Sequence, residues 1–320
     1  VGEADGVVAK ILAYMDNKSA GAWQNVVSLL ADDGDAKMPN QHMKDADSIA
    51  AVMERNYPLY SIDRIFWDDF PYEPSASGIR YPVVTQAIYD RLEKGALVVN
   101  YSGHGSANLL SHEMVWKASD MAAVNSPRVP FCVTASCDIG PFDLGANSVA
   151  ENAILNPNGA AIGLFTTTRT VLQSYNSVIN KAFMTELLAS SVSGKRVAVG
   201  DAVRRAKCNV ITAGSDYSVN KLQFVLLGDP ALRLKTPEYR VVIDEFNGVR
   251  AGESSMVSAG SLLKVSGHVT GFDGQPASDF NGTLYSTLFD SAEDVYTRDN
   301  SGLGSYKYTA FKKTLFSGID

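Results

Sequence analysis

The sequence predicts a mostly parallel α/β sheet with helices on both faces, followed by a β-sandwich module. Two observations lead to this prediction. Continuous apolar runs such as VVSLLA, ALVV and VPFCV alternate with helix-like stretches, and strands buried on both faces of a parallel sheet have this apolar character. The alternation stops near Thr236–Glu238, where short stretches separated by Gly, Asp and Asn turns begin, which is typical of a sandwich. We therefore expect an α/β domain at residues 1–237 and a sandwich at residues 238–320.

Hydrophobic patterning places the elements of the first domain in order. Apolar side chains that recur every three to four residues predict helices, here at residues 7–15, 49–53, 84–92, 147–155, 178–188 and 200–210. Short apolar runs between them predict strands, here at residues 26–35, 62–69, 96–105, 129–138, 159–169 and 224–234. The order of the two kinds of element is that of repeated βα units.

Capping residues set several of the helix ends. Asp47 or Ser48 can serve as the N-cap of the second helix. Gly95 follows the third helix, where glycine commonly ends a helix. Ser148 and Glu151 have the spacing of a capping box at the start of the fourth helix.

Composition narrows the class of protein. The chain has 320 residues and a net charge of −7 without a long basic cluster, so we expect no nucleic-acid partner. No apolar run approaches the roughly 20 residues of a membrane helix. No signal segment precedes the first helix, and we expect the chain to be a mature or shortened form.

The three cysteines do not predict a disulfide or a zinc site. Cys132 and Cys137 share one apparent strand and would lie roughly 16 Å apart, too far for a bond. No pair of cysteines at the short spacing of zinc ligands has a histidine near it. We expect Cys132 to belong to the core and Cys208 to be partly exposed.

His104 and Cys137 are the strongest candidates for chemistry. Each follows an apolar strand, and parallel strands bring such ends to one edge of a sheet. Glycines flank His104 in YSGHG, which leaves the imidazole uncovered. An imidazole can take the proton of a thiol and later protonate a leaving amine, and the amides of Gly105 and Cys137 could form an oxyanion hole. The alternative is that Cys137 is a small buried apolar residue.

The motifs YSGHG and ASCDIG, whose His104 and Cys137 are 33 positions apart, resemble those of the gingipain family of cysteine peptidases. The resemblance implies a caspase-like catalytic domain at residues 1–237 and an immunoglobulin-like sandwich at residues 238–320. It also implies that His104 is the base and Cys137 the nucleophile, with no cofactor required. We expect the catalytic domain to lack an upstream part and the sandwich to be truncated.

Other phrases, such as NVVSLLADDGD, LLGDPALRL and GHVTGFDGQPASDFNGTLY, look most like the cell-surface sortases of the type IX secretion system within that family. This likeness implies removal of the C-terminal signal domain from secreted cargo. The acyl-enzyme would then pass the cargo to anionic lipopolysaccharide at the outer membrane of a Gram-negative bacterium. The implied partners are the signal domains, the lipopolysaccharide and other surface proteins of the system. The alternatives are a gingipain-like endopeptidase that only hydrolyses and a non-catalytic module that docks cargo.

The resemblance also implies an acid that orients the histidine, and Asp45 and Asp47 are the candidates. Spacing does not choose between them, and a plain helix cap is the alternative for Asp47.

Two further stretches have weaker indications. Asp32, Asp33 and Asp35 in ADDGD could hold a structural calcium ion, which the family often binds, or form an acidic turn. Thr166–Leu172, with Thr167, Thr168 and Arg169, follows a strand and could line the substrate pocket or be a simple loop.

His112 is expected to be a surface residue near the site. His42 has no partner that the sequence identifies.

Overall fold

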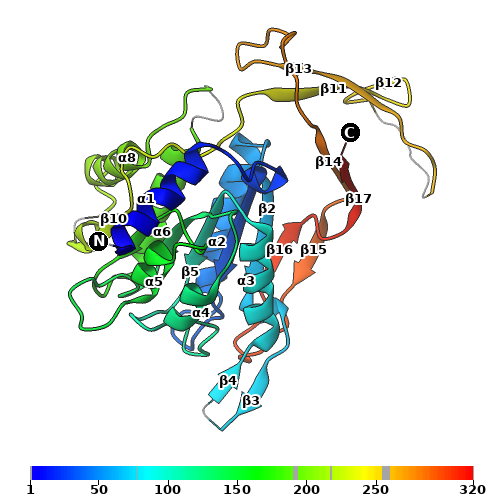
Figure 1. The fold of residues 1–320 in the computed structure, drawn as a ribbon. Helices are drawn as coiled ribbons and strands as arrows, with labels where there is room; N and C mark the ends of the chain where they lie inside the picture. Colours follow the sequence, from blue (N-terminus) through cyan, green and yellow to red (C-terminus); the bar gives the residue numbers. More distant parts are fainter. Residues whose placement is uncertain (1, 77, 190–193, 217, 254–259, 320) are drawn as a thin grey trace.

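The computed structural model describes residues 2–76, 78–189, 194–216, 218–253 and 260–319. Its centre is a six-stranded sheet (Figure 1) with the order β10-β9-β8-β5-β1-β2. Five strands are parallel, and β10 runs antiparallel to β9. The strands are β1 (Val26–Ala31), β2 (Ser61–Phe66), β5 (Val98–Ser102), β8 (Phe131–Ala135), β9 (Gly163–Thr167) and β10 (Phe224–Leu227). The predicted strands are therefore confirmed, although each is shorter than the apolar run that predicts it.

Helices cover both faces of this sheet. Alternate residues of β1 face opposite sides, because side chains alternate along a strand: Leu29 packs in one core and Leu30 in the other. The first core contains residues of α2, α6 and α8, such as Phe183, and the second contains residues of α3, α4 and α5, such as Ile88. The helices are α1 (Gly2–Met15), α2 (Gln41–Asn56), α3 (Pro82–Lys94), α4 (Ala118–Ala123), α5 (Val149–Leu155), α6 (Gln173–Leu188), α8 (Val199–Thr212) and α9 (Asn220–Gln223).

The register of the central strands fixes the position of the candidate site. Ala31 of β1 pairs with Ser102 of β5, and Ser102 pairs with Ala135 of β8. The carboxyl ends of these three strands therefore lie level with one another. His104 lies two residues after Ser102, and Cys137 lies two residues after Ala135. The prediction that they follow adjacent parallel strands is therefore confirmed.

Helix ends agree with the capping predictions except at α2. The capping box of Ser148 and Glu151 is formed, and Gly95 follows α3 with a φ of +83°. Helix α2 begins at Gln41, six residues before Asp47, so Asp47 is not an N-cap. The sequence pattern did not identify the first turn of α2, because buried positions there include the polar residues His42 and Asp45, which interrupt the apolar spacing.

Short 3₁₀ helices and hairpins complete this region. They are η1 (Ala22–Asn25), η2 (Trp67–Asp69), the hairpin of β3 (Glu73–Ser75) and β4 (Gly78–Arg80), and the hairpin of β6 (Leu109–Leu110) and β7 (Trp116–Lys117). Among the described residues, no helix is long and apolar enough to span a membrane.

The strands after residue 238 form small antiparallel sheets. One sheet has the order β12-β11-β13, and the other two are the pairs β14–β17 and β15–β16. The pair β15–β16 packs on the first domain, where Tyr308 is buried against Phe66 and its hydroxyl donates to Asp69. Whether these strands belong to a complete sandwich stays a prediction. Their bounds are β11 (Arg240–Phe246), β12 (Val249–Arg250), β13 (Val265–Thr270), β14 (Tyr285–Phe289), β15 (Glu293–Tyr296), β16 (Lys307–Ala310) and β17 (Thr314–Ile319).

Candidate active site

His104 lies in a tight loop after β5 whose backbone is fixed on several sides. The hydroxyl of Tyr101 donates to the His104 carbonyl at 2.7 Å, and the amide of Ser111 donates to the same oxygen at 2.9 Å. A Cβ on Gly103 would overlap the Tyr101 ring and the Asp32 side chain. The loop therefore needs glycine for close packing, and it presents a half-buried imidazole at the sheet edge.

Asp32, the residue directly after β1, holds His104. One carboxylate oxygen of Asp32 accepts the His104 amide at 3.0 Å and lies 2.9 Å from the ring nitrogen Nδ1. The hydrogen bond with Asp32 raises the pKa of His104 despite partial burial of the ring. A proton on Nδ1 then leaves Nε2 as the basic nitrogen of the neutral ring.

Asp35 lies on the other side of the same ring. Its carboxylate is 3.5 Å from Nε2 of His104. Hydrogen bonds from the amides of Lys37 and Met38 help to lower the pKa of Asp35. A charged Asp35 favours the imidazolium form of His104 once Nε2 has accepted a proton.

Two further histidines contact His104: His112 lies on the surface near the site, as predicted, whereas the sequence did not identify His42 as a neighbour. The exposed His112 stacks on the His104 ring with centroids 4.5 Å apart, and the buried His42 meets it edge-on at 4.9 Å. Burial lowers the pKa of His42. His42 lies on α2, far from His104 in sequence, so only the packing of α2 on the sheet could reveal this neighbour.

Cys137 lies after β8 with its thiol half-buried. In the structure, Sγ is 3.4 Å from the carbonyl oxygen of Val171, to which it donates, and the amide of Val171 lies 3.5 Å from the same sulfur. Within the described part of the chain, no hydrogen bond joins the thiol to His104. Burial raises the pKa of Cys137, an effect that the Val171 amide opposes and the charge of Asp138 reinforces. Burial therefore favours the neutral thiol of Cys137 over the thiolate.

The predicted pocket segment, Thr166–Leu172, packs along the loop of Cys137. The hydroxyl of the buried Thr167 donates to the Ser136 carbonyl, and the amide of Gly140 donates to the Thr167 carbonyl at 2.8 Å. Thr167 therefore holds the loop of Cys137 through two hydrogen bonds. Thr168 is half-buried, while Arg169 is exposed and pairs with Asp143.

The glycine loop and the cysteine loop are packed against each other. A Cβ on Gly105 would overlap Ile139 and Ser136 and would approach the carbonyl of Cys137. Among the described residues, neither the amide of Gly105 nor that of Cys137 donates a hydrogen bond to the protein. The two predicted oxyanion donors therefore lie in two loops that contact each other.

Asp45 and Asp47, the expected orienting acids, are engaged elsewhere. Asp45 accepts hydrogen bonds from Gln41 and Gln173. Asp47 pairs with Arg64 and accepts from Tyr306. The position beside Nδ1 of His104 is occupied by Asp32, so the structure does not support either expected acid in that role.

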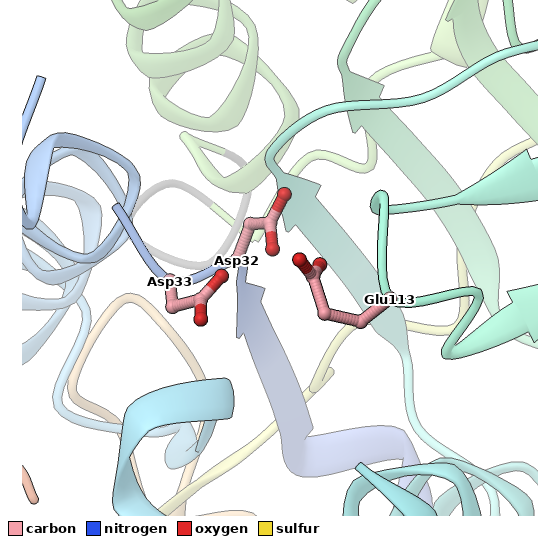
Figure 2. A group of neighbouring side chains, drawn as sticks. All are labelled: Asp32, Asp33 and Glu113. Atoms are coloured by element: carbon pink, nitrogen blue, oxygen red, sulfur yellow. The ribbon is translucent and has the colours of Figure 1, made fainter. Parts of the chain in front are cut away.

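Asp32 also belongs to a group of three acids with Asp33 and Glu113 (Figure 2), whose oxygens lie within 4.8 Å of one another. Burial and the charge of Asp32 raise the pKa of Asp33 to about 8 and also raise the pKa of Glu113. Tyr81 donates to Asp33 at 2.7 Å. Asp35, which the sequence grouped with Asp32 and Asp33, contacts His104 instead, and Glu113 takes its place.

Solved structures with the same fold include gingipains. The crystal structure of the Arg-specific cysteine proteinase gingipain R matches with a TM-score of 0.58 and 16% identity, over 99% of this chain and 65% of that one. The complex of the pro- and mature domains of RgpB from Porphyromonas gingivalis matches with a TM-score of 0.56 and 15% identity, over 98% and 66%. The chain thus spans just under two thirds of the length of these two proteins. Its fold is the caspase-like fold of gingipains, as the sequence predicted.

Dimeric latent PorU from P. gingivalis also matches, with a TM-score of 0.28 and 13% identity, over 92% of this chain and 38% of that one. A likeness of this size does not bear on function. None of the curated proteins compared with the chain matches it. The family model of Peptidase family C25 matches residues 1–235, which include every residue of the site described above. The chain therefore belongs to Peptidase family C25.

Proposed function

We propose that this protein is a cysteine peptidase in which Cys137 is the nucleophile and His104 the general base. The observation that carries the proposal is the strand register, which brings the loops of Asp32, His104 and Cys137 to one edge of the sheet in that order. Membership of a peptidase family supports the same chemistry.

The first half of the reaction follows from the two ring nitrogens of His104. Asp32 holds Nδ1, so Nε2 takes the thiol proton as the sulfur of Cys137 attacks the substrate carbonyl. The resulting imidazolium, stabilised by Asp32 and Asp35, then protonates the departing amine. The product is a thioester between Cys137 and the acyl part of the substrate. Because the resting thiol keeps its proton, His104 must remove it during attack.

The amides of Gly105 and Cys137 would stabilise the oxyanion formed in this step. Backbone donors with no partner in the protein are available to a developing negative charge. Their loops are held together by the tight packing of Gly105 on the cysteine loop, which keeps the two donors at a fixed separation.

We further propose that the protein uses this acyl-enzyme as a sortase of the type IX secretion system. The protein would cut the C-terminal signal domain from cargo at the cell surface, associated with the outer membrane, and pass the cargo to an amine of anionic lipopolysaccharide. It would work with other surface proteins of the system. The phrases that resemble those of such sortases, such as NVVSLLADDGD, support this proposal. Hydrolysis and transfer share the thioester and differ in the acceptor that attacks it.

The catalytic step requires no cofactor in this proposal, but the family resemblance implies a structural calcium ion. Asp32, Asp33 and Glu113 fit such an ion, because oxygen ligands suit calcium and Oδ1 of the buried Asp32 has no hydrogen-bond partner among the described residues. Calcium there would neutralise a group of carboxylates that otherwise repel one another. No chemical step passes through it.

The test uses a purified cargo protein that carries its C-terminal signal domain, with and without a small amine such as glycinamide. Intact-mass spectrometry of the products separates the readings, and Cys137→Ala is the control for uncatalysed cleavage. A cargo amide whose fraction rises with amine concentration supports the sortase. Free acid alone at every amine concentration indicates a hydrolytic endopeptidase. Binding of the tail without cleavage would overturn the enzyme and favour a docking module.

A further inference from the structure

Helix α2 contacts His104 and also the segment that holds the thiol of Cys137. His42 and Asp45 lie three residues apart, on the same side of the helix. Both are buried, with 5% and 9% of their surfaces exposed. Burial of polar side chains in a helix that is otherwise packed through apolar residues costs free energy unless these side chains have partners.

His42 touches the base. Its ring meets that of His104 edge-on, with centroids 4.9 Å apart and an interplanar angle of 83°. Nε2 of His42 is buried and has no hydrogen-bond partner among the described residues. The contact with His104 is therefore made by the ring itself. Together with Asp32 at Nδ1 and the stacked His112, His42 limits rotation of the His104 ring.

Asp45 reaches the segment that holds the nucleophile. It accepts a hydrogen bond from the side chain of Gln173, the first residue of α6. Two residues earlier, the backbone of Val171 holds Sγ of Cys137 through both its amide and its carbonyl. Asp45 therefore fixes the end of the segment that sets the thiol position.

Provided that His104 and Cys137 form the catalytic pair proposed above, we infer that His42 and Asp45 are positioning residues that use α2 as a rigid spacer between base and nucleophile. His42 acts through His104, and Asp45 acts through Gln173 and Val171. Neither touches the reacting atoms. A helix suits this task, because its backbone fixes the separation of the two side chains.

The test compares truncating and shape-preserving variants of each residue: His42→Ala with His42→Phe, and Asp45→Ala with Asp45→Asn. The exposed pair His268 and Asp244, which are 2.9 Å apart on the strands after the first domain, supplies the matched controls His268→Ala and Asp244→Ala. The best peptide substrate is first identified by letting the wild-type protein cleave a peptide library. Then kcat and KM are measured on it, with kcat normalised to the number of reactive active sites and thermal unfolding recorded for each variant.

We expect His42→Ala and Asp45→Ala to lower kcat by about ten- to hundredfold, since small displacements of reacting groups have effects of this size, while KM changes by less than about twofold. His42→Phe keeps a ring and should restore kcat to within about threefold. Asp45→Asn keeps one acceptor and should restore it in part. The two control variants should equal the wild type.

Three results would overturn the inference. If the wild type is active and kcat is unchanged in both alanine variants, the positioning role is wrong and the proposed function is unaffected. Equal loss in His42→Phe and His42→Ala shows that the ring contact is not what matters. Absence of any cleavage by the wild type removes the proposed function and this inference together.

Discussion

The protonation state of the Cys137 thiol can be measured directly through the pH dependence of its alkylation. Burial raises the pKa of this thiol above its ordinary value of 9.0. At pH 7 the thiol therefore predominates, and the thiolate fraction rises about tenfold per pH unit below the pKa. Only the thiolate reacts with iodoacetamide. Between pH 6.5 and 8.5, the rate constant for Cys137 should consequently rise by about a hundredfold.

The assay follows iodoacetamide labelling by intact mass and peptide mapping. Cys132 is buried and should stay unlabelled while the fold is intact, and Cys208 is exposed and reports reagent activity in the same sample. His104→Gln should keep the same pH slope, because the resting thiol bonds to Val171 rather than to His104. A nearly flat rate over this pH range that becomes steep in His104→Gln would refute the reasoning. It would show a thiolate–imidazolium pair already formed in the resting enzyme.

The remaining predictions concern the groups around that thiol. Asp32→Asn should reduce kcat for peptide cleavage on the order of 10²- to 10⁴-fold, because the amide no longer holds His104 in its reactive tautomer; activity within threefold of the wild type, with an intact circular dichroism spectrum, would contradict this. Calcium should raise the unfolding temperature of the wild type but not of Asp33→Asn. Differential scanning fluorimetry measures this shift, with magnesium as the comparison ion. An equal calcium shift in both proteins would exclude Asp32, Asp33 and Glu113 as the calcium site. Gly105→Ala should abolish turnover and lower the unfolding temperature, since a Cβ there overlaps the cysteine loop; full turnover would remove the packing argument.

Much of the sheet could be predicted from the sequence, because strands buried on both faces leave continuous apolar runs and each run is followed by a helix or a loop. The placement of His104 and Cys137 after neighbouring parallel strands was predictable for the same reason. Both follow such runs, with no predicted helix in the connection between them. The structure adds the short helix α4 there, and the two strands remain neighbours.

The contact between Asp32 and Nδ1 of His104 was not predictable in the same way. Asp32 is 72 residues before His104, and a local pattern does not state which strand lies on the far side of β5. The signal was present, since Asp32 also follows an apolar strand directly, but ADDGD reads equally well as an acidic turn. Asp45 and Asp47 were proposed from a family likeness. Their engagement with Gln173 and with Arg64 depends on packing between helices and strands that spacing along the chain does not encode.

The three groups of the site follow the order of the strands. Asp32, His104 and Cys137 come after β1, β5 and β8, and these strands are consecutive neighbours whose last residues pair in register. Neighbouring strands are about 4.8 Å apart, so the backbones that carry these three residues lie about one strand spacing from one another. The sheet thus determines the order of the groups, while the loops determine their final contacts. A shift of one residue between β5 and β8 would turn the side chains of one strand to the opposite face. The tightly packed apolar side chains of these strands oppose such a shift. The geometry of the site therefore depends on the packing of the core.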